Sequence, residues 1–281
     1  MSTADKIPLG LVLDMPAEVY HATHAMSAGG LKRMRQSPAH FYGMQLDPNR
    51  PEPGEPTPAM KNGTLVHCCI FEPHAVDARY VIKPDGMSLS TKEGRAWKEA
   101  NAGREIVDAE QMAAAQAQAA ALRRLPEIGA LLSEGFGEAS AFWIDAATGE
   151  LCKCRPDWTS PAGDGVILLD GKTCQDASPE GFSRQVWNMD YWLQAAWYSD
   201  GYEKATGKRV HGFVFAAVES AWPHAAAAYM LGDDVLERAR AENRRLLDLY
   251  AECRRTGVWP GYVNTIQQIN LPAWAMKEIA Q

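Results

Sequence analysis

The stretches LCKCRPD at positions 151–157 and VILLDGK at positions 166–172 decide the fold of this chain. The turn sequence PAGDG at positions 161–165 separates them. The apolar run at 166–169 is short and bounded by turn residues, which is typical of a buried central strand. We therefore expect Asp157 and Asp170 to lie on neighbouring strands, close to each other.

Two converging carboxylates repel each other unless a cation lies between them. Lys172 follows Asp170 by two residues, so the period of a strand places both side chains on one face. A hard divalent cation with oxygen ligands, beside an ammonium group, suits phosphodiester hydrolysis. The alternative is an ordinary Asp–Lys ion pair at a strand end, because a lone D-x-K is a weak signal.

Three further motifs accompany these residues. The PD at 156–157 and the DGK at 170–172 together resemble the PD-(D/E)XK nuclease signature. The QAAWY at 194–198 has the four-residue spacing that places two polar groups on one helix face, and it resembles the extra motif of the RecB-like branch. The GTLVH at 63–67 resembles the helix that supplies a histidine in this branch. In combination, residues 20–262 resemble the RecE-type exodeoxyribonuclease (exonuclease VIII) domain of phages and prophages.

This resemblance implies an α/β fold, a PD-(D/E)XK nuclease core with a mixed central β-sheet flanked by helices. It implies a metal site formed by His67, Asp157, Asp170 and the carbonyl of Gly171. It implies that Lys172 positions or activates a water and that Gln194 and Tyr198 orient the lysine and the phosphate. In the resembled pattern a glutamate near Glu138, which we expect to open a strand, helps to hold the metal or the lysine. A solvated acid at a strand end is the alternative for Glu138.

His67 lies in an apolar stretch, 59–71, where Gly63-Thr64 can start a helix. A lone histidine there is more often a core residue with a satisfied hydrogen bond than a ligand. The downstream motif favours the ligand, and an imidazole beside carboxylates predicts that Mn²⁺ serves alongside Mg²⁺. Gly171 departs from the resembled pattern, in which an apolar residue is usual. A glycine still supplies a carbonyl, but we expect the strand to be less constrained and metal affinity to be lower.

Basic residues cluster in the segment 27–38, where Ser27 is a helix N-cap and Pro38 marks the helix end. A similar segment opens the resembled domain near the DNA path, which makes this set a candidate for phosphate contact: Ser27, Lys32, Arg33 and Arg35. A solvated basic face is the alternative. Arg184 follows a helix start at Ser178-Pro179 and is a further candidate for contact with DNA phosphates.

The resemblance also implies an activity and its partners. It implies Mg²⁺-dependent 5′→3′ digestion of linear double-stranded DNA, which leaves 3′ overhangs for a single-strand annealing protein in phage-type recombination. It further implies a ring-like homo-oligomer, a trimer or a tetramer. Two alternatives stay open: another RecB-like activity, single-stranded or endonucleolytic, and a catalytically silent scaffold that binds DNA ends.

Composition narrows the class of protein. The net charge of −7 argues mildly against a surface coated in basic residues, yet it allows basic residues along one channel. No apolar stretch is long enough to span a membrane, and positions 1–8 lack a signal peptide, so we expect a cytoplasmic protein without membrane contact. The six cysteines suit reduced thiols. Only Cys253 lies near the C-terminus, so we expect no iron–sulfur cluster.

The order of segments predicts one nuclease domain over 1–281. Residues 9–60 form an N-terminal helix and a mobile loop at 46–59, residues 61–231 the core, and residues 232–281 a helix and a tail. A hairpin is predicted over 138–157, helices over 107–132, 191–202 and 233–255, and strands over 210–218 and 225–231. The Ala-Gln repeats at 113–121 offer few large apolar groups and predict a peripheral helix or a subunit contact.

Overall fold

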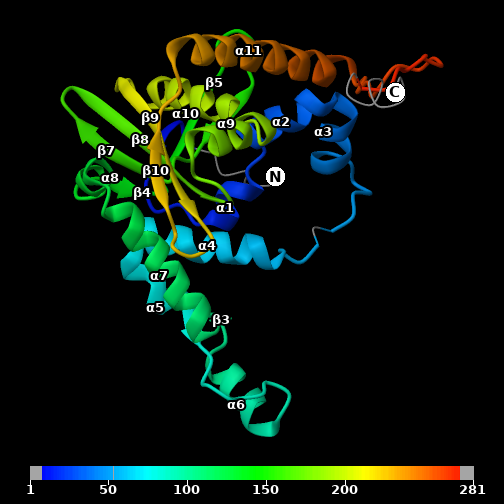
Figure 1. Cartoon of the computed structure of the whole chain (residues 1–281). Helices are drawn as coiled ribbons and strands as arrows, with labels where there is room; N and C mark the ends of the chain where they lie inside the picture. Colours follow the sequence, from blue (N-terminus) through cyan, green and yellow to red (C-terminus); the bar gives the residue numbers. More distant parts are fainter. Residues whose placement is uncertain (1–7, 53, 273–281) are drawn as a thin grey trace, which may run out of the picture.

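The centre of the molecule is a five-stranded mixed sheet, seen in a computed structural model that describes residues 8–52 and 54–272 (Figure 1). The strand order is β10-β9-β8-β7-β4. Only β8 and β9 run parallel, and the other neighbours are antiparallel. The strands are β4 (Phe136–Gly137), β7 (Trp158–Ala162), β8 (Gly165–Cys174), β9 (Val210–Glu219) and β10 (Ala226–Tyr229). The expected α/β fold is confirmed.

The β7–β8 hairpin brings the two motif carboxylates together. Its register pairs Trp158 with Leu169 and Ala162 with Gly165, so residues 163–164 form the turn and Asp157 lies opposite Asp170. Pro161 belongs to β7, which makes the turn tighter than the sequence indicated. Strand β8 is the middle strand of the sheet, and Leu168 and Leu169 are fully buried, as the apolar run predicted.

Helices cover both faces of the sheet. Alternate residues of β8 explain this arrangement, because Leu168 packs with α9 (Pro179–Asn188) and α10 (Tyr191–Thr206) while Leu169 packs with α4 (Pro58–Phe71) and α7 (Ala109–Arg123). Helix α11 (Asp233–Thr256) lies against α10, and its bounds are close to those of the helix predicted over 233–255. The central sheet therefore has a core on each side.

The predicted hairpin at 138–157 is present but belongs to a separate three-stranded sheet. Its order is β1-β5-β6, formed by β1 (Gly10–Val12), β5 (Ser140–Ile144) and β6 (Leu151–Cys154). Glu138 does not open a strand, which corrects that expectation. It lies in the connection from β4 to β5 with a left-handed backbone, φ +55°.

The N-terminal segment forms three helices, α1 (Ala17–Ala22), α2 (Ala28–Gln36) and α3 (Pro38–Gln45). Ser27 caps α2 through a hydrogen bond from the Gly30 N–H, as predicted. Pro38 does not merely end a helix. Ser37 closes α2 and its side chain caps α3, in which Pro38 is the first residue. Residues 46–57 form no helix or strand in their described part, and Pro53 lies outside it.

A narrow extension projects from the body beyond α4 and α7 (Figure 1). It contains a 3₁₀ turn (Pro73–Ala75), α5 (Val76–Arg79), β2 (Tyr80–Ile82), α6 (Lys92–Ala100) and β3 (Glu105–Val107), and α8 (Pro126–Leu131) follows α7. Of the two alternatives for 113–121, the peripheral helix is wrong, and the subunit contact stays a prediction. Ala115 and Leu122 of α7 are fully buried, because small side chains let this helix approach α4 and the sheet closely.

After α11 the chain packs against α3 before its last described segment. The Trp259 ring stacks on Phe41 with centroids 5.7 Å apart, and the Ala39 N–H donates to the carbonyl of Pro260 at 3.0 Å. The predicted tail extends to Trp274, which lies outside the described residues. Among the helices that the structure describes, none is long and apolar enough to cross a membrane. All six cysteines are free and buried.

Candidate metal and active site

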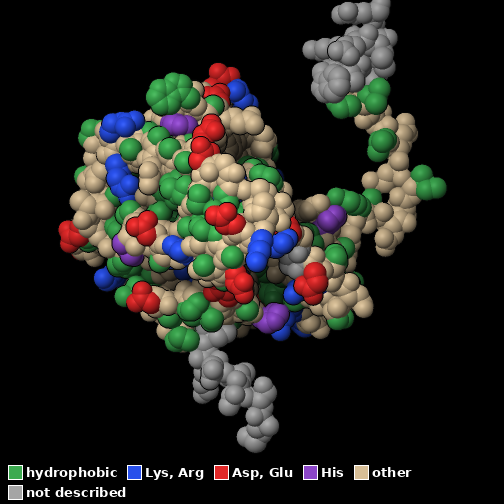
Figure 2. Space-filling model, turned by 90° about the horizontal axis from the view of Figure 1, so that it is seen from below, with side chains coloured by type: hydrophobic (Ala, Val, Ile, Leu, Met, Phe, Trp, Pro, Cys, Tyr) green, Lys and Arg blue, Asp and Glu red, His purple; other side chains and the backbone are tan. Residues whose placement is uncertain are grey.

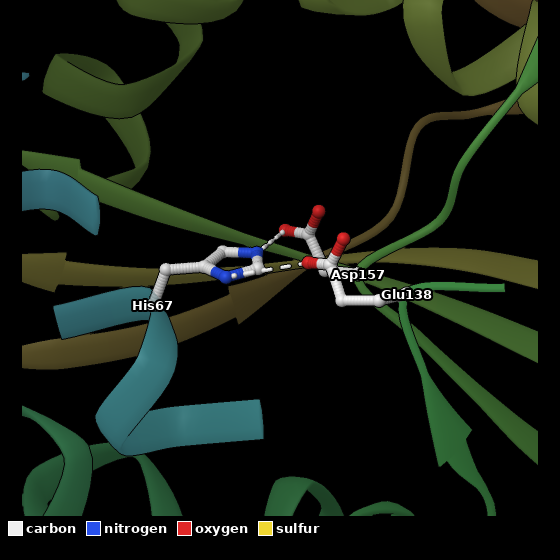
Figure 3. Close-up of side chains that lie close together, drawn as sticks. All are labelled: His67, Glu138 and Asp157. Carbon is white, nitrogen blue, oxygen red and sulfur yellow. Dashed lines mark ion pairs between the residues drawn. The ribbon is translucent and has the colours of Figure 1, made fainter. Parts of the chain in front are cut away.

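Three side chains from separate elements converge beside the β7–β8 hairpin. His67 projects from α4, Glu138 from the β4–β5 connection and Asp157 from the residue before β7 (Figure 3). The imidazole Nε2 lies 3.0 Å from Asp157 Oδ2, and Nδ1 lies 3.5 Å from Glu138 Oε1. One ligand atom from each residue lies within 4.8 Å of the others.

Local structure explains how each group reaches this point. Helix α4 begins at Pro58, because the Thr57 hydroxyl caps it and proline occupies its first position, not at Gly63 as the sequence indicated. His67 then lies one turn before the C-terminal residue Phe71, on the side that faces the sheet. The left-handed turn at Glu138 directs its carboxylate back toward Asp157, and its N–H donates to the Asp157 carbonyl at 3.2 Å.

Asp170 forms a second group next to the first. It is 2% exposed, its Oδ1 pairs with the Lys172 ammonium, and its Oδ2 accepts a hydrogen bond from the Gln194 amide. The two groups are joined through Gly171, whose N–H donates to Asp157 Oδ2 at 2.7 Å. The predicted metal set therefore divides: Asp157 and His67 lie with Glu138, while Asp170 is held by Lys172 and Gln194.

The charges in this site are strongly coupled. Burial, and after it the neighbouring Asp157 carboxylate, raise the pKa of Asp170 to about 6 against the opposing effect of Lys172. Burial also raises the pKa of Glu138, with Asp157 adding to it. Burial opposes the charge of Asp157, but His67 and Lys172 outweigh it and lower its pKa. Burial alone lowers the pKa of His67, yet Asp157 and Glu138 raise it to about 9.

These residues fit a divalent cation. The two carboxylates of Glu138 and Asp157 and the imidazole nitrogen of His67 are a hard, largely oxygen donor set of the kind that Mg²⁺ and Mn²⁺ take. In the metal-free protein a proton on His67 compensates the charge of Glu138 and Asp157. A divalent cation held by His67, Glu138 and Asp157 would neutralise phosphate charge and lower the pKa of a water.

A cavity of about 430 Å³ opens beside these groups and is lined by residues of α4, β8 and α10. His67, Gly171, Lys172 and Tyr191 all line it. The Lys172 ammonium lies 4.4 Å from the centroid of the Tyr191 ring, and the Lys32 ammonium lies 5.0 Å from the same centroid. Lys32 of α2, which the sequence made a candidate for phosphate contact, therefore lies beside the active site.

Of the other four candidate residues for DNA contact, Ser27, Arg35 and Arg184 have protein partners. Arg35 Nη1 pairs with Asp190 Oδ1 at 2.9 Å, and its guanidinium lies over the Trp187 and Trp192 rings. Arg184 is exposed and pairs with Glu180 at 2.7 Å. Ser27 serves as a helix cap, and Arg33 is half-buried. Lys32 is thus the member of the predicted set that lies nearest the candidate active site.

Tyr198 lies on the same helix as Gln194 and packs against Phe213, with ring centroids 6.0 Å apart. Burial raises the pKa of its hydroxyl far above the ordinary value, and the Asp170 and Asp157 carboxylates add to this effect. The hydroxyl therefore stays protonated and able to donate. The structure places Tyr198 near both carboxylates without showing its role.

Two residues that support the site, Arg155 and Phe71, were not predicted from the sequence. Arg155 Nε lies 2.6 Å from Glu138 Oε2, so this arginine orients the carboxylate, and the RPD motif at 155–157 contained the signal. Phe71 packs its ring 4.8 Å from the His67 ring and against Gly171. Only the fold reveals Phe71, because its contact with β8 joins residues a hundred positions apart.

Comparison with known proteins supports the fold. Residues 27–272 match the family described as PDDEXK-like domain of unknown function (DUF3799). A crystal structure of a "Putative exonuclease" from Eubacterium rectale matches with a TM-score of 0.63 at 16% identity, over 94% of this chain and 98% of that one. The protein SSO0001 matches with a TM-score of 0.28 at 14% identity, over 66% of this chain and 87% of that one. No curated protein matches.

The family match spans most of the chain and includes every residue of the site from His67 to Tyr198. The mixed sheet, the carboxylates on neighbouring strands and the lysine two residues after Asp170 agree with the PD-(D/E)XK signature expected from the sequence. The chain belongs to the family of PDDEXK-like domains of unknown function.

Proposed function

We propose that this protein is a divalent-metal-dependent exodeoxyribonuclease of the RecE type. It degrades linear double-stranded DNA in the 5′→3′ direction and leaves 3′ single-stranded overhangs. The observation that carries the proposal is the convergence of His67, Glu138 and Asp157 directly beside the Asp170–Lys172 pair. A metal-ligand set next to a buried ammonium group is the arrangement that phosphodiester hydrolysis needs.

Each residue has a proposed role. His67, Glu138 and Asp157 hold the cation, with Asp170 and the Gly171 carbonyl completing the set as the scissile phosphate enters. Asp170 raises the pKa of Lys172 against the effect of burial, so the ammonium group stays charged and orients the attacking water or stabilises negative charge. Gln194 holds the Asp170 carboxylate in place, and Tyr198 donates to the phosphate. Ser27, Lys32, Arg33, Arg35 and Arg184 remain candidates for DNA contact, with Lys32 the strongest.

The resemblance to RecE-type domains supplies the rest of the proposal. Mg²⁺ is the expected cation and Mn²⁺ substitutes for it. The enzyme acts in the cytoplasm, hands its 3′ overhangs to a single-strand annealing protein in phage-type recombination and assembles as a ring of three or four copies.

A single assay tests the activity and its polarity. Linear duplex DNA labelled at its 5′ or 3′ ends is incubated with Mg²⁺, Mn²⁺ or EDTA, and closed circular DNA serves as a parallel substrate. Loss of the Lys172 ammonium should reduce the rate by at least about a hundredfold, the typical effect of removing one electrostatic stabiliser. The matched control is Lys208→Ala, which removes an exposed lysine from the opposite end of the parallel strands.

We expect release of 5′-terminal nucleotides from linear DNA in Mg²⁺ and Mn²⁺, none in EDTA, and none with Lys172→Ala. Cleavage of circular DNA would instead indicate an endonuclease of the same fold. DNA that is bound but intact in both metals would show that the chain is a scaffold for DNA ends.

A further inference from the structure

The segment after α11 presents a row of large apolar side chains to solvent. Ile266 and Ile269 are 105% and 87% exposed, and Tyr262, Val263 and Leu271 are more than half exposed. In Figure 2 green side chains follow this segment where it stands clear of the body. Its sequence, YVNTIQQINL at 262–271, has no charged residue and is rich in residues that favour strands. Such a segment gains stability by pairing with a sheet.

Strand β10 offers an edge for that pairing. It is the outermost strand of the central sheet on its side, and its residues Ala226, Ala227 and Ala228 carry no charge and no proline. Proteins normally protect an exposed edge strand with charges, proline or a covering element, because the unpaired backbone groups can bind another strand. Strand β10 contains neither a charged residue nor a proline.

An apolar groove of about 760 Å³ adjoins the end of β10. It lies between α9 and the N-terminal half of α11, and its apolar lining includes Phe182, Val186, Trp187, Tyr229, Met230 and Val235, with Arg35, Arg238 and Glu242 among its charged residues. Trp187 and Met230 are each 60% exposed. A strand added to β10 would direct alternate side chains toward this groove, since Tyr229 packs on the same face of the sheet as α9.

Distance argues against pairing within one chain. The apolar segment leaves the body at Tyr262, shortly after the C-terminal end of α11, where the Tyr262 ring lies 5.7 Å from the His40 ring, whereas the groove meets α11 at Val235 and Arg238 (Figure 1). The helix separates these points by about 27 Å, because each helical residue rises about 1.5 Å. An extended chain needs about eight residues to cover that distance. The eight residues from Val263 to Asn270 would be spent on the path and could not pair with β10.

We infer that residues 262–271 form an arm that adds as a β-strand to β10 of a second copy of this chain, with apolar side chains in that copy's groove. Backbone hydrogen bonds supply the pairing, and alternate side chains supply the selectivity. An exchange of identical arms is an inexpensive route to assembly, because every copy provides both surfaces. This inference concerns assembly alone and does not depend on the proposed nuclease activity.

Light scattering and sedimentation of the full-length chain at micromolar concentrations test the arm. We expect the wild type to be larger than a monomer, and Ile269→Asp/Leu271→Asp to weaken association at least tenfold, because these two side chains lie on one face of an extended arm and Asn264 and Asn270 lie on the other. Asn264→Asp/Asn270→Asp is the matched control, because it adds the same charge to the arm without removing an apolar group, and it should keep the assembly. Unchanged circular dichroism and Tm would show that each variant is folded.

A complementation experiment tests the receiving surface. Met230→Glu places a charge in the groove and should also give a monomer. The arm variant retains an intact groove and the groove variant an intact arm, so an equimolar mixture should form a complex that neither forms alone. A monomeric wild type, an assembly that survives both variants, or a mixture that stays monomeric would each overturn the inference.

Discussion

Gly171 occupies the middle of the DGK motif because Phe71 fills the space that a side chain would need. A Cβ atom at this position would lie 2.7 Å from Phe71 Cε2 and 3.2 Å from Cζ. The same aromatic ring packs against His67. The sequence alone suggested a loosely held strand here. The structure shows that an apolar group from α4 takes the place of the apolar residue usual in such motifs, so the glycine belongs to a packed arrangement.

Substituting Gly171→Ala should therefore displace Phe71 and, with it, the His67 imidazole. We expect a loss of stability of about 1–3 kcal/mol, the usual cost of overpacking a core. We also expect weaker Mn²⁺ binding, measured by titration calorimetry beside thermal unfolding.

The double variant Gly171→Ala/Phe71→Leu should recover part of both losses, because the smaller side chain makes room. Gly43→Ala is the control, since a Cβ there meets no atom within 4 Å. If Gly171→Ala bound Mn²⁺ as the wild type does, Phe71 would have no part in holding His67.

The His67 imidazole predicts how metal affinity depends on pH. Asp157 and Glu138 raise its pKa to about 9, so at neutral pH the metal-free protein holds a proton on this ring. A metal ligand must be deprotonated, so binding releases that proton. Affinity for Mn²⁺ should rise with pH, by up to about tenfold per unit below the pKa, and level off above about pH 9.

Calorimetry in buffers of different ionisation enthalpy measures both the affinity and the proton released. His67→Asn should flatten the pH dependence and lower the affinity at high pH. Equal proton release by the wild type and this variant would show that His67 is not the group that the metal displaces.

At the scale of elements, the sequence predicted what local patterns determine. The strands of the β7–β8 hairpin and β9, and helices α9 to α11, lie where periodicity and turn residues placed them. The sequence indicated a start of α4 at Gly63, whereas the helix begins at Pro58. The capping signal Thr57-Pro58 is hard to recognise because it lies at the end of a proline-rich run. The sequence indicated a peripheral position for α7, because each alanine side chain buries little apolar area. Their small size is what allows α7 to pack deeply against α4.

The site was predictable in its motif and unpredictable in its long-range contacts. Asp157, Asp170 and Lys172 follow from one hairpin, so their proximity could be deduced from strand register. The position of the Glu138 carboxylate in the site depends on a left-handed backbone conformation at this residue. No local sequence pattern indicates such a conformation at a residue other than glycine. The reach of Lys32 to Tyr191 depends on how α2 packs against α10, and that packing joins segments far apart in the sequence.

At the scale of the whole molecule, most basic residues of the C-terminal helix are neutralised. Arginines along α11 pair with acids on the same helix or on neighbouring elements, and these include Arg240, Arg244, Arg245, Arg254 and Arg255. This pairing suits a net charge of −7 and leaves α11 a poor surface for DNA. Two ammonium groups instead meet beside the active-site cavity, where those of Lys32 and Lys172 lie 5.0 Å and 4.4 Å from the centroid of the Tyr191 ring.

This distribution predicts which basic residue contributes to DNA binding. Burial lowers the pKa of Lys32 to about 8, with Lys172 adding to the effect, so its ammonium is still charged at pH 7. In EDTA, where DNA is expected to remain intact, the affinity for linear duplex should fall as salt rises. Lys32→Ala should weaken binding and reduce the slope of log affinity against log salt by about one, because one phosphate contact is lost.

Lys208→Ala is the matched control, since that lysine is exposed at the opposite end of the parallel strands from the cavity and should leave the slope unchanged. Raising the pH from 7 to 9 should lower the slope of the wild type, as Lys32 loses its proton, and affect Lys32→Ala less. Equal slopes for wild type and Lys32→Ala at pH 7 would place the DNA away from the cavity. An acidic protein would then have to bind DNA through basic residues that its own carboxylates already neutralise, and the weak affinity expected from such a surface would be measurable in the same titration.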